Sequence, residues 1–180
     1  VLGALPIVLV AVGTACRSEP TPPPARPKVY VSNETAGTVE VIDAAAGTVD
    51  AQIHVGKRPR GITISRDGAT LYVALSGSPI APPGVDESTL PPPDRSADGI
   101  GVVDLATGRR SRTIESRQEP EACDLSPDGR PLYVSNEETA EMSVVDLQTG
   151  KVTRRVAIDE EPEGVTVSPD GRIVYITCEA

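Results

Sequence analysis

Aromatic residues are scarce in this chain. It has no Phe or Trp, and four Tyr are the whole aromatic content of its 180 residues. A core without large rings must be built from thin aliphatic layers, and sheets stacked face to face suit that construction. The chain also has a single His, His54, which excludes a paired-His metal site and a CxxCH haem attachment within this sequence.

Basic residues are fewer than acidic residues in this chain. Seventeen Lys and Arg stand against 26 Asp and Glu, which gives a formal net charge of −9 and a pI near 4.6. Phosphate backbones would be repelled by such a surface, so we expect no nucleic-acid partner. The acidic balance also fits ordinary solubilising charge.

The chain begins with an uncharged apolar run, VLGALPIVLVAVGTA, at residues 1–15. It is too short to span a bilayer and ends in small residues, as the hydrophobic region of a signal peptide does. We therefore expect an exported protein whose given sequence begins inside its signal peptide. A buried N-terminal strand is the alternative, and the Pro cluster at 20–24 disfavours it.

Cys16 follows Gly-Thr-Ala and precedes RSEPTPPPARP, and this segment resembles a bacterial lipoprotein signal. The resemblance implies acylation of Cys16 and a Pro-rich tether over residues 16–27. Gly13 stands where Leu is commonest, so cleavage after Ala15 without lipidation remains an alternative. We predict a periplasmic or cell-envelope location, with the membrane reached only through this lipid.

The rest of the chain is a tandem repeat. Tyr30 and Tyr72 are 42 residues apart, as are Tyr133 and Tyr175. The same order of landmarks follows in each unit: an Asp that closes a strand, a Gly four residues later, a Pro twelve beyond it, and an Asp-Gly pair eight further on. The three sets are Asp43, Gly47, Pro59 and Asp67; Asp104, Gly108, Pro120 and Asp128; and Asp146, Gly150, Pro162 and Asp170.

Short runs rich in Val, Ile and Thr lie between these landmarks, without the spacing of an amphipathic helix. Four such strands per repeat of about 42 residues predict the blade of an all-β propeller, with four-stranded antiparallel sheets over residues 28–180. The first unit lacks its innermost strand and the fourth is cut off. We expect a strand from the far C-terminus to close the ring.

The segments YVSNE, VEVID and LYVSNEETAEMSVVDLQTG, with SPDGRIVYIT near the end, resemble the YVTN-type β-propeller repeats of bacterial exported and surface proteins. The resemblance covers residues 28–180 apart from one insertion. It implies a seven-bladed ring. It also relates the fold to the haem-binding propeller of nitrite reductases, to the heavy chain of methylamine dehydrogenase and to lactonases.

The insertion breaks the repeat between Tyr72 and Asp104, which are 32 residues apart where other units need 13. It occupies about residues 77–98 and joins the second and third strands of its blade. An ordered lid or docking loop and a disordered segment are the two alternatives.

Charged residues are predicted to gather on the same rim, in the loops before the first strands and after the second strands. The candidate binding residues are Arg58, Arg60, Glu119, Glu121, Glu137, Glu138, Glu161 and Glu163, with Lys57 and Glu179 nearby. One interpretation is a site for a cation, a small molecule or a basic protein partner. A solvated rim is the other.

Other reactive residues receive structural roles. Asp43, Asp104 and Asp146 are expected to fix turns, and His54 to lie on the surface of an outermost strand. Cys123 and Cys178 fall toward the same rim on successive blades, as a disulfide or as two free thiols.

The sequence thus favours an exported, non-catalytic binding or scaffold propeller with no cofactor. A redox-associated propeller that holds a cofactor or docks a cytochrome is the first alternative. A lactonase-like hydrolase is the second, although it would need a central His that this sequence does not provide.

Overall fold

The structure is a computed structural model, and it describes residues 26–179. The predicted signal region 1–15, Cys16 and most of the tether 16–27 lie outside the described residues.

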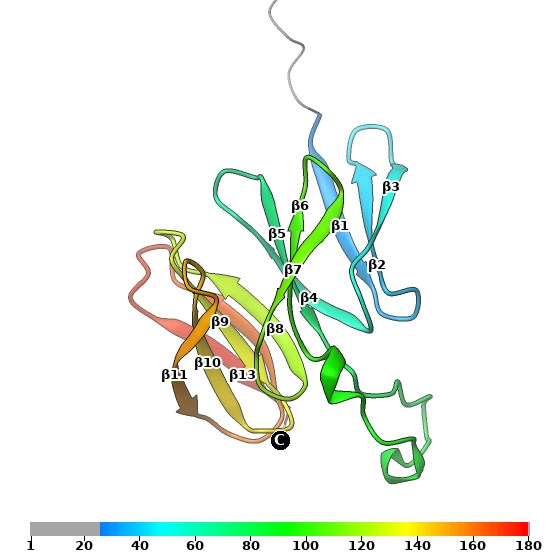
Figure 1. Cartoon of the computed structure of the whole chain (residues 1–180), viewed down its shortest axis with the longest axis vertical. Helices are drawn as coiled ribbons and strands as arrows, with labels where there is room; N and C mark the ends of the chain where they lie inside the picture. Colours follow the sequence, from blue (N-terminus) through cyan, green and yellow to red (C-terminus); the bar gives the residue numbers. More distant parts are fainter. Residues whose placement is uncertain (1–25, 180) are drawn as a thin grey trace, which may run out of the picture.

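The described chain forms four antiparallel sheets, which follow one another in chain order (Figure 1). Blade 1 comprises β1 (Lys28–Asn33), β2 (Thr38–Asp43) and β3 (Thr48–His54). Blade 2 comprises β4 (Pro59–Ile64), β5 (Thr70–Leu75), β6 (Gly99–Asp104) and β7 (Arg109–Ile114). Blade 3 comprises β8 (Pro120–Leu125), β9 (Pro131–Asn136), β10 (Glu141–Asp146) and β11 (Lys151–Ala157). Blade 4 comprises β12 (Pro162–Val167) and β13 (Val174–Cys178).

Each sheet is a simple meander, as the repeat predicts. In blades 2 and 3 the four strands lie side by side in chain order. In blade 1, β1 occupies the position that the second strand has in blades 2 and 3. The first strands contact one another from blade to blade, β4 against β8 and β8 against β12, while β1 contacts β4. All-β four-stranded sheets packed in this way are those of a propeller fragment.

The core lies between successive blades and is aliphatic. Between blades 2 and 3 it contains Ala74, Ile100, Val102, Ile114, Cys123, Leu132, Val134 and Val145. Between blades 1 and 2 it contains Val39, Ile53, Val55, Leu71, Val73, Leu75 and Val103. The outer sheets keep apolar side chains in solvent, including Val29 and Val31 on β1 and Tyr175 on β13.

Small residues let the first strands approach closely. A Cβ atom on Gly61 of β4 would lie 2.7 Å from Cα of Ala122 on β8, a separation that real side chains do not adopt. Ala122 and Gly164 occupy the equivalent repeat positions in β8 and β12. The strand contact therefore depends on the absence of a side chain at Gly61.

The turn role predicted for the three aspartates is confirmed. Oδ1 of Asp43 accepts hydrogen bonds from the backbone N–H groups of Ala45 and Ala46, at 2.9 and 3.0 Å. Asp104 and Asp146 accept from Thr107 and Thr149 in the same way, at 2.9 and 2.8 Å. These backbone donors hold the pKa of each carboxyl below its usual value.

We expect Leu132→Ala to lower the free energy of unfolding by about 2–5 kcal/mol, because it opens a cavity between blades 2 and 3. Leu132 is completely buried in the inter-blade core. Denaturant unfolding of the full chain measures the change. Val85→Ala, on an exposed side chain of the insertion, is the matched control and should leave stability within about 0.5 kcal/mol. Equal effects would contradict the inter-blade core.

Candidate binding rim

The residue before the first strand of each blade has the same unusual backbone. Arg58, Glu119 and Glu161 have φ of 35°, 54° and 49°, the left-handed region that side chains other than glycine seldom adopt. Each carbonyl accepts a hydrogen bond from the residue that follows the second strand. The pairs are Ser76 to Arg58 at 3.2 Å, Glu137 to Glu119 at 2.9 Å, and Glu179 to Glu161 at 3.1 Å. The repeated bond fixes these strained loops at one rim.

Two further repeat positions face the same rim. The second residue of the first strands is Arg60 in β4, and the equivalent residues in β8 and β12 are Glu121 and Glu163. The residue after the second strand is Glu34, Ser76 or Glu137 in blades 1 to 3. Blade 2 differs from blades 3 and 4, because it has Arg58 and Arg60 at two positions where they have glutamates.

Arg60 joins carboxylates from three other blades. It forms an ion pair with Glu121 of blade 3 and lies 3.8 Å from carboxylate oxygens of Glu34 in blade 1 and Glu163 in blade 4. Arg58 makes similar contacts, at 3.1 Å to Glu34 and 3.0 Å to Glu119. Both guanidinium groups are largely buried, so these pairs are less screened than surface ion pairs.

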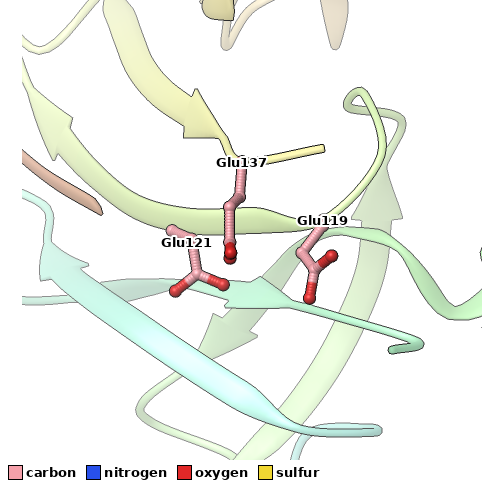
Figure 2. A group of neighbouring side chains, drawn as sticks. All are labelled: Glu119, Glu121 and Glu137. Carbon is pink, nitrogen blue, oxygen red and sulfur yellow. The ribbon is translucent and has the colours of Figure 1, made fainter. Parts of the chain in front are cut away.

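Glu119, Glu121 and Glu137 bring their carboxylates together between the blades (Figure 2). One oxygen from each lies within 4.8 Å of the others. Glu121 is 3% exposed, and its Oε2 faces Arg60. Among residues 26–179, no hydrogen-bond donor reaches its other oxygen, Oε1.

Burial raises the pKa of Glu121 to about 9. The guanidinium of Arg60 opposes this shift, whereas the neighbouring carboxylates of Glu137 and Glu163 add to it. Burial also raises the pKa of Glu137. Glu121 therefore binds a proton more readily in the folded chain than an ordinary glutamate does.

The insertion, residues 77–98, lies beside these carboxylates. Arg95 is 3.0 Å from Glu138, 3.4 Å from Asp98 and 4.0 Å from Glu119. Asp98 accepts a hydrogen bond from the backbone N–H of Glu119 at 3.3 Å. The insertion contains two short 3-10 helices, η1 (Glu87–Thr89) and η2 (Arg95–Ala97).

A backbone hydrogen bond closes the base of the insertion. The N–H of Asp94 donates to the carbonyl of Gly77 at 2.9 Å. We call residues 78–93, which lie beyond this bond, the tip; in Figure 1 the green insertion extends away from the sheets. Residues 94–98 stay at the rim and carry Arg95 and Asp98.

A cavity of about 320 Å³ lies between the tip and the rim. The tip contributes Ser78, Pro79, Ser88, Leu90 and Pro91–Pro93 to its lining. The rim contributes Glu119, Glu137 and Glu138, together with Arg58 and Arg95. The tip thus lines the cavity mainly with apolar side chains, and the rim lines it mainly with carboxylates.

Most of the predicted rim residues come together, and three are placed differently. Glu179 is exposed at the end of blade 4. Glu161 is exposed, and no ion pair within residues 26–179 reaches it. Lys57 pairs with Asp94 of the insertion instead of a rim glutamate. Sequence reasoning missed Glu34, although it stands at the offset of Glu137, and it missed Arg95 and Asp98, for which the repeat gives no signal.

The two cysteines are free thiols, so the disulfide alternative is not realised in the structure. Cys123 is buried between blades 2 and 3, where its Sγ faces the carbonyls of Gly61 and Tyr72. The thiol of Cys178 faces the carbonyl of Asp159. His54 is exposed on β3, as expected.

The fold and rim define a β-propeller-type domain with a charged rim beside one long inter-strand insertion. The chain belongs to the choice-of-anchor I domain family, whose model matches residues 25–180. No helix within residues 26–179 is long and apolar enough to cross a bilayer.

Known proteins that resemble the chain include a surface antigen and an enzyme. Antigen Lp49 of Leptospira interrogans is 30% identical over 109 residues, which are 61% of this chain and 23% of the antigen. Hydrazine synthase of Kuenenia stuttgartiensis superposes with a TM-score of 0.66 and 24% identity, over 82% of this chain and 37% of that one. The chain thus spans less than half of either relative. The family and the antigen indicate an exported or surface-associated protein, and the synthase shows likeness of fold alone.

We expect the free energy of unfolding to fall as pH rises from about 5 to about 9 in metal-free buffer. A carboxyl whose folded pKa is raised stabilises the fold fully below its unfolded pKa, and this contribution is lost as pH rises through the folded pKa of about 9. Glu121→Gln should flatten this part of the profile, because the amide does not ionise. Chemical denaturation at several pH values measures both proteins, and parallel profiles would contradict the shifted pKa.

Proposed function

We propose that this protein is an exported, non-catalytic binding module that recognises a basic segment of a partner protein at its rim. A single Lys or Arg side chain of the partner would enter the cavity between the tip and the rim. The observation that carries the proposal is the cavity itself, which prolines and Leu90 of the tip and carboxylates of the rim line together.

The two parts of the lining match the two parts of a long basic side chain. Lys and Arg bury an aliphatic stem along apolar surface while the charged head seeks anions. Leu90 and the prolines of the tip would contact the stem, and Glu119, Glu137 and Glu138 would face the head. The cavity volume, about 320 Å³, is at the lower end of ligand pockets and suits one side chain.

The charge around the cavity favours a cation. Glu34, Asp98, Glu119, Glu121, Glu137, Glu138 and Glu163 supply seven carboxylates, and Arg58, Arg60 and Arg95 supply three guanidinium groups. Because the pKa of Glu121 is raised to about 9, this carboxyl is protonated at neutral pH, and the excess is three negative charges. Such a concentration of one sign steers an oppositely charged partner toward the site.

The same proposal includes the finer expectations from sequence. These are a seven-bladed ring of YVTN type, a periplasmic or cell-envelope location, and attachment through lipid on Cys16. The apolar side chains left in solvent on β1 and β13 support further blades, which would cover them. The Pro-rich segment after Cys16 supports a tether.

Removing the tip tests the cavity. Gly77 and Asp94 are already joined by a hydrogen bond of the kind that closes a two-residue turn, so Asn-Gly can replace residues 78–93. We expect this variant of the full chain to keep its melting temperature within a few degrees. Its affinity for a Gly-Gly-Lys-Gly-Gly peptide should fall at least tenfold by calorimetry at low salt, because the apolar lining for the lysine stem is gone.

Two controls define the result. The norleucine analogue of the peptide should bind the intact chain more weakly than the lysine peptide, because it lacks the charge. Glu160→Gln, in an exposed loop outside the cavity, should bind the lysine peptide like the parent chain. Equal lysine-peptide affinity with and without the tip would refute the proposed pocket.

Cys16→Ser tests the anchor. If Cys16 carries lipid, the variant should leave the membrane fraction and become soluble after export, since the acyl chains are the membrane-binding element. Fractionation and mass spectrometry of the mature N-terminus provide the measurement. An unchanged distribution, or an N-terminus at another residue, would contradict lipidation.

A further inference from the structure

We propose that Glu119, Glu121 and Glu137 bind one divalent cation with the coordination chemistry of Ca²⁺. The site goes beyond the proposed binding of a basic partner, although it shares Glu119 and Glu137 with the cavity lining. It lies where the loop before β8, the strand β8 itself and the end of β9 meet (Figure 2).

The buried oxygen of Glu121 is the observation that points to a ligand. The residue is 3% exposed, yet Oε1 has no donor among residues 26–179. A buried acceptor without a partner costs about 1–3 kcal/mol, and more when it is charged. One carboxylate oxygen from each of the three residues lies within 4.8 Å of the others, so a cation bound among them would satisfy all three.

The ligand atoms select the kind of cation. Three carboxylate oxygens within 4.8 Å of one another can converge on one ion, and oxygen-only ligands favour hard cations. Soft or borderline ions would seek thiolate or imidazole, but Cys123 faces backbone carbonyls and His54 is exposed on β3. Ca²⁺ tolerates irregular geometry and water ligands better than Mg²⁺, so we assign the site to Ca²⁺.

Two arginines hold two of these carboxylates, each through one oxygen. Arg60 engages Oε2 of Glu121, and Arg58 donates to Oε1 of Glu119 at 3.0 Å. Each pair leaves the other oxygen of its carboxylate free of that arginine. The surrounding excess of carboxylates over guanidinium groups keeps the position favourable for a cation.

The test is calorimetric titration of the chelator-treated full chain with CaCl2. We expect one Ca²⁺ per chain with a Kd of roughly 10⁻⁴–10⁻³ M, the range of extracellular calcium modules. The melting temperature should rise with CaCl2 concentration, because the ion binds the folded chain. MgCl2 should bind at least tenfold more weakly.

Glu121→Gln should weaken Ca²⁺ binding at least tenfold and abolish the rise in melting temperature. Its amide can donate toward Glu137 and accept from Arg60, so the variant should fold without the ion. Glu137→Gln is the second variant and should show the same loss. Glu161→Gln, at the repeat position of Glu119 but exposed and outside the cluster, is the matched control and should bind like the parent chain.

Three results would overturn the site. They are the absence of a saturable signal up to 10 mM CaCl2, unchanged affinity in both glutamine variants, and an equal loss in Glu161→Gln. The tip-deleted chain separates this inference from the proposed function. It should bind Ca²⁺ normally, so lysine-peptide binding and Ca²⁺ binding can fail independently.

Discussion

Arg60 is the group on which the rim depends. The repeat places equivalent residues of successive blades near one another at the rim. Glutamates at all of these positions would repel one another at close range. Arg60 interrupts that run in blade 2 and contacts carboxylates from blades 1, 3 and 4. Removing one partner of such a largely buried pair leaves an uncompensated charge, which is far costlier than losing a surface ion pair. The ion pairs of Arg60 therefore link neighbouring blades.

The reach of Arg60 depends in turn on the thin core. With no Phe or Trp, the sheets pack through Val, Leu, Ile and Ala, and at Gly61 no side chain separates β4 from β8. This contact brings Arg60 beside Glu121 across the blade boundary. The small aliphatic residues of the core thus allow the strands to approach closely, and this approach allows the ion pair at the rim.

The sequence predicts the sheets well because the turn residues recur at fixed offsets, and Asp43, Asp104 and Asp146 act at these turns as expected. The gathering of Glu119, Glu121 and Glu137 follows from the same periodicity. Two things do not follow from it. Arg95 lies in an insertion without a counterpart in the other blades, so no offset could bring it to Glu138. The unpaired oxygen of Glu121 depends on side-chain orientation, which a repeat pattern does not specify.

Because the base of the insertion is closed, the insertion can change without a change in the two strands that flank it. Gly77 and Asp94 meet at a backbone hydrogen bond, so the length and composition of the segment between them can vary while β5 and β6 keep their register. Surface segments with adjoining ends are where insertions and grafts are tolerated best. This blade thus offers a place where related chains can exchange recognition loops, and where a foreign epitope or binding peptide could be displayed on an otherwise conventional scaffold.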